Sequence, residues 1–411
     1  MTAWTILQFL AFQRSAILKI AATRWSLLVG ALLVLSGSLA RNYDGAYFPV
    51  EWHALTHGIG VSTVNALILF TLVYLAGTHW SRDEAHAEGQ TFAPRVPFVP
   101  ALLSFLGLFW MAAPMAWLYG IPYERFLSEE HAFRANAWTL ILVSIWRITL
   151  TTRILSVIFC VPAKRVFWFV MLFSDITLLL ALWFAPLPVL DFMGGMQQSP
   201  LERKLSSAAF MAGFYGVITL LVWLIGVGWA MSNFTIRWAP ARSTASRPPW
   251  AAIALGIIAI TAWTSAASLT QHEQRNRLAA ERLLRANRID EALAELSRHP
   301  RTDFPPIWDP PPRPAWRITT PDIAAIRAAL AQGEYAPWVE ELFWAKCWRD
   351  MNSYKHLAWR DLDNINSRFS EQTCAAIVLH AEHDPFRTPE ERAALTAAAT
   401  RCQAIPRSPG Q

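Results

Sequence analysis

Charged residues are scarce in this sequence. Of its 411 residues, 16% are Asp, Glu, Lys or Arg, whereas an ordinary soluble domain contains about a quarter. The deficit is concentrated before residue 270, where uninterrupted apolar runs reach the ~20 residues that a helix needs to cross a bilayer. This composition excludes an ordinary soluble domain and predicts an integral membrane protein.

Cysteine is scarce as well, since the chain contains four. Cys160 lies in an apolar run, and Cys347, Cys374 and Cys402 lie in the C-terminal part without a Cys-x-x-Cys pair or zinc-ribbon spacing. Walker and Rossmann glycine motifs, a Gly-x-Ser-x-Gly nucleophile elbow and a His-Glu-x-x-His zinc motif are also absent. The sequence therefore gives no support for the enzyme classes that these motifs mark.

The formal net charge of +6 and the pI near 9.3 do not indicate a nucleic-acid partner. The basic residues are scattered along the chain, and no recognition motif accompanies them. In a membrane protein such an excess lies mostly in cytoplasmic loops that face anionic lipid. We therefore predict membrane lipid, and no nucleic acid, as a partner. Arginine greatly outnumbers lysine and alanine is abundant, which is typical of a GC-rich bacterial genome.

The predicted fold is all-α, a polytopic transmembrane bundle of about seven spans with a small C-terminal extramembrane helical domain. Residues 1–24 are predicted to form a cytoplasmic or interfacial helix, because three basic residues are spaced among apolar ones. Residues 25–269 are predicted to form the bundle, with spans at 25–40, 58–77, 98–119, 136–161, 166–185, 208–231 and 250–269. A cleaved signal peptide is the rival interpretation of the first span, because Ser38-Leu39-Ala40 resembles a signal-peptidase site.

The distribution of basic residues predicts the orientation of this bundle. One set of alternate connections carries ten of them: Arg14, Lys19, Arg24, Arg82, Arg95, Lys164, Arg165, Arg237, Arg242 and Arg247. The other set carries five: Arg41, Arg125, Arg134, Arg203 and Lys204. The richer side is predicted to be cytoplasmic. The N-terminus is then cytoplasmic and the C-terminal domain extracytoplasmic, at a bacterial inner membrane.

After residue 269 the composition becomes polar. Residues 270–299 are predicted to form a helical hairpin, since Leu278–Leu296 resembles one helix-turn-helix of the tetratricopeptide type, without a second copy at the period of about 34 residues. Residues 300–321 form a proline-rich connector of extended backbone. Residues 322–411 are predicted to form a small helical domain, which could dock a protein partner.

The densest group of chemically able side chains lies in the loop Arg41–His57, between two predicted spans. Polar loops on a rigid scaffold are where sites tend to lie. We therefore select eight candidate substrate-binding residues there and on the facing segments: Arg41, Tyr43, Asp44, Glu51, His53, His57, Glu124 and Arg147. The structural alternative is a turn in which Arg41 pairs with Asp44.

His53 and His57 are spaced by four residues, so on a helix they face the same way. That spacing suits two ligands of a divalent metal, although zinc needs a third protein ligand. The alternative is that both histidines cap the helix and contact water at the membrane surface. We predict no cofactor, with a metal at these histidines as the alternative.

Three charges interrupt the predicted spans, where an isolated charge costs about 3 kcal/mol or more. Arg153 and Asp175 each lie about ten residues from the turn near Lys164, so they are predicted at similar depth as a structural ion pair. Arg147 has no acidic partner at its depth. It either bonds backbone carbonyls or neighbouring polar side chains such as Asn65, or it binds an anionic head group, carboxylate or phosphate.

The pattern Arg41-x-Tyr-Asp-Gly, followed by Glu51-x-Trp-His53 and later by Trp117-x-Tyr-x-Ile-Pro122, resembles a group of bacterial multi-pass membrane proteins without a known activity. The likeness covers mainly the first four spans. It implies a location in the membrane and no chemistry.

Two functions follow from these observations. The first is a non-enzymatic scaffold or partner-docking subunit of the cell envelope, because the helical C-terminal part contains tryptophans and no catalytic motif. The alternative is a membrane-embedded enzyme or transporter that acts on an anionic, lipid-linked or phosphate- or carboxylate-bearing substrate at the outer face.

Overall fold

A computed structural model describes residues 2–87, 97–184, 200–232, 234–239, 247–306, 308–312, 321, 323–353 and 400. These residues contain helices and no β-strand, so the all-α prediction is confirmed. The chain divides into two compact units: Met1–Ala185 with Ala208–Gln274, and Pro186–Ser207 with Arg275–Gln411. Helices α8 (Pro200–Met231) and α9 (Trp250–Arg285) contribute residues to both units.

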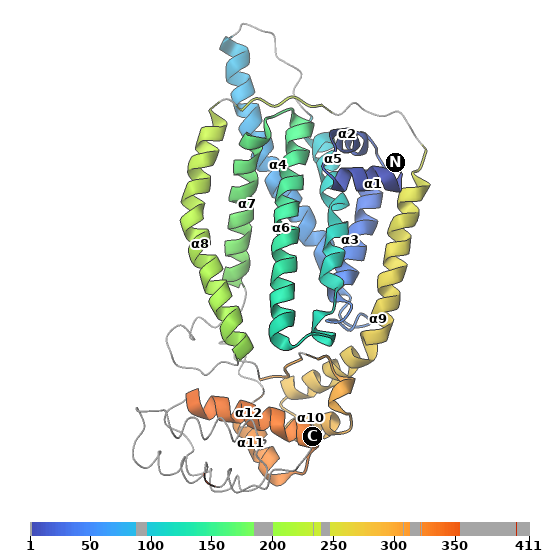
Figure 1. Cartoon of the computed structure of the whole chain (residues 1–411), viewed down its shortest axis with the longest axis vertical. Coiled ribbons are helices and arrows are strands. Elements are labelled where there is room, and N and C mark those ends of the chain that lie inside the picture. The colour runs from blue at the N-terminus through green and yellow to red at the C-terminus, as the bar shows by residue number, and fades with distance from the viewer. Residues whose placement is uncertain are drawn as a thin grey trace. The chain divides into compact units, whose positions relative to one another are not determined.

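The first unit is a helical bundle (Figure 1). Within the described residues, six helices are long and apolar enough to cross a membrane, and a seventh span is counted if α2 and α3 are taken as one bent segment. The multi-pass prediction is therefore confirmed. Besides α8 and α9, the helices of this unit are α1 (Ala3–Leu10), α2 (Arg14–Ala21), α3 (Ser26–Asn42), α4 (His53–Ala87), α5 (Phe98–Met111), η1 (Ala113–Gly120), η2 (Tyr123–Arg125), α6 (Glu129–Phe159) and α7 (Ala163–Phe184).

The N-terminal segment forms two short helices rather than the single predicted one. Thr2 and Thr5 form a capping box that starts α1. The break after α1 contains Phe12, whose φ of 63° interrupts the helical backbone. α2 and α3 are then bent by 109° relative to each other. The apolar faces of α1 and α2, including Phe9 and Ile17, lie in the bundle core.

Aromatic side chains fill the middle of the bundle. The ring of Phe70 on α4 lies 5.5–5.7 Å from the rings of four neighbours: Tyr74, Phe98, Phe105 and Phe159. α3 and α5 cross closely because Gly30 lacks a side chain; a Cβ there would lie 2.8 Å from Cβ of Trp110. These contacts fix the four helices that surround the candidate site.

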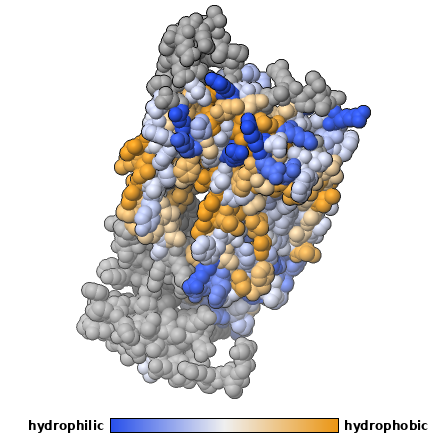
Figure 2. Space-filling model, turned by 45° about the horizontal axis from the view of Figure 1, so that its top comes forward, coloured by the Kyte–Doolittle hydropathy of each residue, from blue (hydrophilic) through white to orange (hydrophobic). Residues whose placement is uncertain are grey.

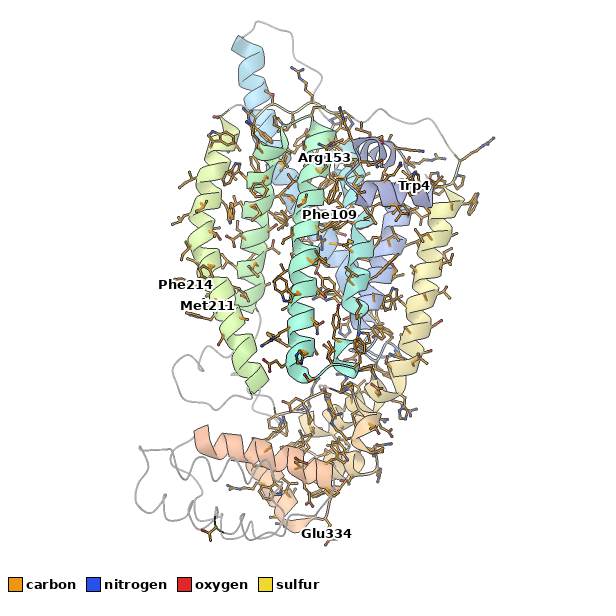
Figure 3. The ribbon with its side chains drawn as sticks, viewed as in Figure 1. Trp4, Phe109, Arg153, Met211, Phe214 and Glu334 are labelled. Carbon is orange, nitrogen blue, oxygen red and sulfur yellow. The ribbon has the colours of Figure 1, made fainter. Side chains whose placement is uncertain are left out.

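Apolar side chains cover much of the bundle surface, and hydrophilic ones gather near its ends (Figure 2). Trp183 is 83% exposed and Ile225 is 75% exposed. Met211 and Phe214 point outward from α8 (Figure 3). So large an exposed apolar surface is unfavourable in water and suits a lipid environment.

The third predicted span changes its helical form near Pro114. α5 ends at Met111, and the chain continues as the 3₁₀ helix η1, which contains this proline at its beginning. η1 packs against α3. Its last residue, Gly120, allows η1 to approach both α3 and α9, because a Cβ there would lie 3.0 Å from the Ala40 carbonyl oxygen and 2.2 Å from the Trp263 ring.

Asp175 has a different partner from the one predicted. Its carboxylate is 7% exposed and accepts a hydrogen bond of 3.0 Å from the Thr219 hydroxyl on α8. An ion pair between Asp175 and Arg153 is not among those of the described residues. Arg153 lies six residues before the end of α6, near one end of the bundle (Figure 3), while Asp175 lies twelve residues into α7. Their depths therefore differ by roughly 9 Å at about 1.5 Å per residue.

Two helices occupy residues 270–299, for which a helical hairpin is predicted. The first is the end of α9, which continues without a break from the apolar segment, and the second is α10 (Ile289–Ser297). Asn287 has the left-handed φ of 56° at the turn between them. The Pro-rich segment begins with the 3₁₀ helix η4 (Arg301–Asp303). Two further helices, α11 (Ile323–Gln332) and α12 (Pro337–Ser353), form a second helical hairpin.

The described core of the second unit is apolar and includes a buried carboxylate. This carboxylate belongs to Glu281, which is 2% exposed. It accepts a hydrogen bond from the Trp308 indole and forms ion pairs with Arg277 and Arg285. Trp308 is thereby held against α9. The predicted helix start at Thr388-Pro389 lies outside the described residues.

Candidate functional site

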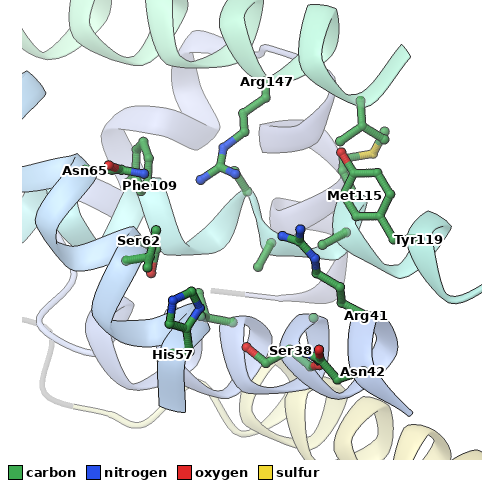
Figure 4. A pocket seen from close by; sticks show the side chains of 18 of the residues that line it. Ser38, Arg41, Asn42, His57, Ser62, Asn65, Phe109, Met115, Tyr119 and Arg147 are labelled. Carbon is green, nitrogen blue, oxygen red and sulfur yellow. Dashed lines mark hydrogen bonds between the residues drawn. The ribbon is translucent and has the colours of Figure 1, made fainter. Parts of the chain in front are cut away.

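A cavity of about 460 Å³ lies inside the first unit. Its walls come from α3, α4, α6 and the segment that α5 and η1 share, so four parts of the chain enclose it (Figure 4). The residues that line it are Val34, Gly37, Ser38, Arg41, Asn42, His53, Ala54, His57, Gly58, Val61, Ser62, Asn65, Phe109, Ala112, Ala113, Met115, Ala116, Tyr119, Val143, Trp146 and Arg147.

Four of the eight predicted residues come together in this cavity. Arg41 is contributed by the last turn of α3, His53 and His57 by the first turns of α4, and Arg147 by the middle of α6. The side chains of Arg41 and Arg147 point into the same space, with His57 on the facing wall (Figure 4). The fold therefore joins the predicted loop to the predicted intramembrane charge.

Neither arginine of the cavity is neutralised by a described residue. The guanidinium of Arg147 lies 4.9 Å from the ring centroid of Phe109, which is a cation–π contact. Among the described residues, neither Arg41 nor Arg147 forms an ion pair or a hydrogen bond. The predicted alternative, in which Arg147 bonds Asn65 or another polar neighbour, is not the arrangement found.

The remaining polar groups of the cavity are hydrogen-bond donors or neutral groups. None of its lining residues is acidic. Asn42 and Ser62 donate to backbone carbonyls of their own helices, at 2.8 and 3.0 Å. Asn65 and Tyr119 have no hydrogen-bond partner among the described residues. Two uncompensated cations and free donors thus face one space, which is the chemistry that recognises an anion.

Tyr43 and Asp44 do not line this cavity. They lie beside it, in a loop whose backbone is hydrogen-bonded to α9. The side chains of Thr270 and Gln274 on α9 donate hydrogen bonds to the carbonyls of Tyr43 and Asp44. The side chain of Gln271 donates to the Ala46 carbonyl at 3.1 Å and accepts from the backbone N–H of Phe48 at 3.0 Å. These bonds satisfy the polar backbone of the loop and hold it on α9.

Burial raises the pKa of both the Tyr43 hydroxyl and the Asp44 carboxyl. Loss of solvent around the Tyr43 hydroxyl is the largest cause and raises the pKa to about 12, and the nearby Asp44 carboxylate adds to it. Burial is also the largest cause of the raised pKa of Asp44, with Glu124 and Glu273 adding to it and Arg125 opposing it. Tyr43 also packs against Trp263, with 5.5 Å between ring centroids.

Glu51 and Glu124 also have local partners. The carboxylate of Glu51 accepts a hydrogen bond of 2.7 Å from the backbone N–H of Tyr47, so it closes the turn that leads into α4. The carboxylate of Glu124 accepts from the Asn136 side chain on α6. Of the eight predicted residues, Arg41, His53, His57 and Arg147 line the cavity, whereas Tyr43, Asp44, Glu51 and Glu124 do not.

His53 and His57 both line the cavity, as their spacing predicts. In the described part of the chain, no group of three or more His, Cys, Asp and Glu side chains comes together around them or elsewhere. A tetrahedral zinc site with three such ligands is thus not assembled from the described residues.

Ser38, Asn42, Ser62 and Tyr119 also line the cavity, although they are not among the eight predicted residues. For three of them the signal was helical spacing: Ser38 and Asn42 are four residues apart on α3, and Ser62 lies three residues before Asn65 on α4. Such polar residues in apolar segments are individually common. Only the packing of the helices shows that they face one cavity.

The fold and the cavity define a class: a multi-pass helical membrane protein with a cationic, acid-free cavity in its bundle. Comparison with protein-family models, with curated proteins and with solved structures found no match. Function is therefore argued from this site.

Proposed function

We propose that the membrane bundle binds the phosphate or carboxylate group of a substrate between Arg41 and Arg147, as a membrane enzyme or transporter. The observation that carries this proposal is the pair of guanidinium groups that face an acid-free cavity without an ion-pair partner among the described residues. Positive charges that face one space repel each other. An anion would relieve this repulsion and accept hydrogen bonds from both planar donors.

The other polar groups of the cavity complete a binding site of this kind. Asn65 and Tyr119 supply neutral donors, which fix the orientation of a bound group. His53 and His57 supply imidazoles, the side chains best suited to accept or donate a proton near neutral pH. The cavity thus offers both binding and proton-transfer groups.

We further propose that the cavity is reached from the outer face of a bacterial inner membrane. The support is the excess of Lys and Arg in the connections on the opposite side of the predicted spans, which favours a cytoplasmic location for that side. In this orientation the N-terminus is cytoplasmic, and the loop Arg41–His57 is extracytoplasmic. Accessibility labelling of single cysteines placed at Gly45 and at Lys164, in intact cells, tests this orientation.

Calorimetric titration of the detergent-purified full chain with inorganic phosphate, and separately with acetate, tests the binding proposal. A charge-assisted hydrogen bond contributes about 1.5–3 kcal/mol, so Arg147→Gln and Arg41→Gln should each weaken binding of the preferred anion about 10- to 100-fold. Arg153→Gln is the matched control, because it removes a cation from the same helix outside the cavity. Equal affinities for all four proteins, or binding of neither anion, would overturn the proposal.

A docking function of the C-terminal part is a second proposal. It is supported by the two consecutive helical hairpins, α9 with α10 and α11 with α12, because stacked hairpins are the building unit of helical protein-binding modules. A cellular assay with the full chain distinguishes the two functions. Loss of residues 286–411 should abolish a docking function and spare anion binding, whereas Arg147→Gln should do the reverse.

A further inference from the structure

A separate apolar groove lies along α4 and shares no lining residue with the cavity. It has a volume of about 910 Å³ and lies between α4, α7 and α8. Its lining is apolar except for one threonine: Leu67, Ile68, Thr71, Leu72, Leu75, Ala76, Phe169, Leu172, Val227 and Met231. The cavity and the groove belong to the same unit of the chain.

The two sites share one face of α4. His57, Val61 and Asn65 line the cavity, and Ile68, Leu72 and Leu75 line the groove. Successive members of this series are four, four, three, four and three residues apart, which is the spacing of a single stripe along an α-helix. At the His57 end, the stripe faces the polar and cationic side chains of the cavity. At the Leu75 end, it faces the apolar side chains of the groove.

The length of the apolar part matches one leaflet of a bilayer. From Asn65 to Leu75 the helix rises ten residues, about 15 Å at 1.5 Å per residue. The hydrocarbon core of a bilayer is about 30 Å thick, so one leaflet contributes about 15 Å. An acyl or polyprenyl chain could lie along this stripe while its head group occupies the cavity.

The cavity also meets the lipid-facing surface of the bundle. Its wall residue Val61 is 43% exposed, and Val64, three residues further along α4, is 53% exposed. On α6, Leu140 lies two helical turns before Arg147 on the same face and is 56% exposed. Apolar exposed side chains thus flank the cavity on both helices, which suits entry of a ligand from the bilayer.

We infer that the ligand is an amphiphile, a lipid or lipid-linked molecule with an anionic phosphate or carboxylate head. The head group lies between Arg41 and Arg147, and the chain lies in the groove of α4, α7 and α8. This inference rests on the proposed anion site and names its substrate class. A small water-soluble anion would use the cavity alone and leave the groove without a role.

Native mass spectrometry of the detergent-purified full chain separates the two possibilities. Dioleoyl phosphatidic acid serves as the long-chain ligand and glycerol phosphate as its head group alone. Wild type should bind the long-chain lipid at least tenfold more tightly. Ile68→Trp and Leu75→Trp should fill the groove and lower affinity for the lipid about tenfold, without changing affinity for glycerol phosphate. Both positions are partly exposed, at 49% and 60%, so the larger ring can be accommodated.

The controls distinguish failure of the inference from failure of the anion site. Leu221→Trp adds the same ring at a 65% exposed position of α8 that lines neither space, and it should leave both affinities unchanged. Arg147→Gln should weaken both ligands. Equal binding of lipid and glycerol phosphate, with no effect of the groove variants, overturns the lipid inference and leaves the anion site standing. An Arg147→Gln protein that binds both ligands as wild type does overturns the anion site itself.

Discussion

Arg125 and Glu273 form a bidentate ion pair, with 3.0 Å between Nη1 and Oε1 and 2.7 Å between Nη2 and Oε2. The pair joins η2 to α9, segments 148 residues apart in the chain. Its side chains are 31% and 16% exposed, so it is partly withdrawn from solvent. Next to it, Gln271 and Gln274 hold the loop that leads from Arg41 to His53. The loop beside the cavity is thus held by α9, which itself lines none of the cavity.

Breaking the ion pair should destabilise the bundle. Removal of one partner leaves a partly buried charge without compensation, so we expect Arg125→Ala and Glu273→Ala each to lower the free energy of unfolding by about 1–3 kcal/mol. A double-mutant cycle in detergent, followed by thermal unfolding, measures their coupling. The control cycle uses Arg134 and Glu130, whose pair is 66% and 50% exposed and should couple by less than about 0.5 kcal/mol. A coupling for Arg125 and Glu273 no larger than this control contradicts the expectation.

Removal of the Gln271 side chain should loosen the loop without unfolding the bundle. Gln271→Ala leaves the Ala46 carbonyl and the Phe48 N–H without their side-chain partners. We therefore expect faster amide hydrogen exchange across residues 43–51, by about tenfold, because each lost bond contributes roughly 1 kcal/mol. Exchange within α6 serves as the internal control. A uniform increase over the whole bundle would show that the bonds stabilise the fold globally instead.

The sequence predicts the membrane class better than it predicts the site. Apolar runs of bilayer length require helices, because the backbone must satisfy its own polar groups in lipid, and the bundle has them. Arg147 and the Arg41–His57 loop were recognisable because charge in a span and a dense polar loop are each rare. That Arg41 meets Arg147, while Tyr43 and Asp44 turn toward α9, depends on how the helices pack. Which helix faces which cannot be read from the spacing of residues along a single sequence.

The same reasoning explains the difference at Asp175. The prediction places the turn near Lys164, which lies inside α7. α6 ends at Phe159 and α7 begins at Ala163, so Arg153 and Asp175 are displaced by roughly two helical turns. The partner that Asp175 does have, Thr219, carries no charge that marks it in the sequence.

Replacement of Asp44 by asparagine should stabilise the protein at neutral pH. The folded-state pKa of Asp44 is raised above its ordinary value of 3.8, chiefly by burial. The folded protein therefore favours the protonated carboxyl, and stability falls as pH rises from below 3.8 through the folded-state pKa. Asp44→Asn removes this loss, so its Tm should exceed that of wild type at pH 7 and equal it at pH 3. A gain of the same size at both pH values would assign the effect to something other than ionisation.

Asp175 and Thr219 should be coupled, and Asp175 and Arg153 should not. Thr219→Val removes the hydroxyl that donates to the buried carboxylate and preserves the shape of the side chain. We expect a coupling of about 1–2 kcal/mol between Asp175→Asn and Thr219→Val, since the hydrogen bond involves a poorly solvated acidic group. The cycle of Asp175→Asn with Arg153→Gln, measured by the same unfolding assay, should give less than about 0.5 kcal/mol. A larger coupling to Arg153 would mean that the two side chains meet in the membrane despite their different depths, and the arginine would then be unsuitable as the control for the cavity.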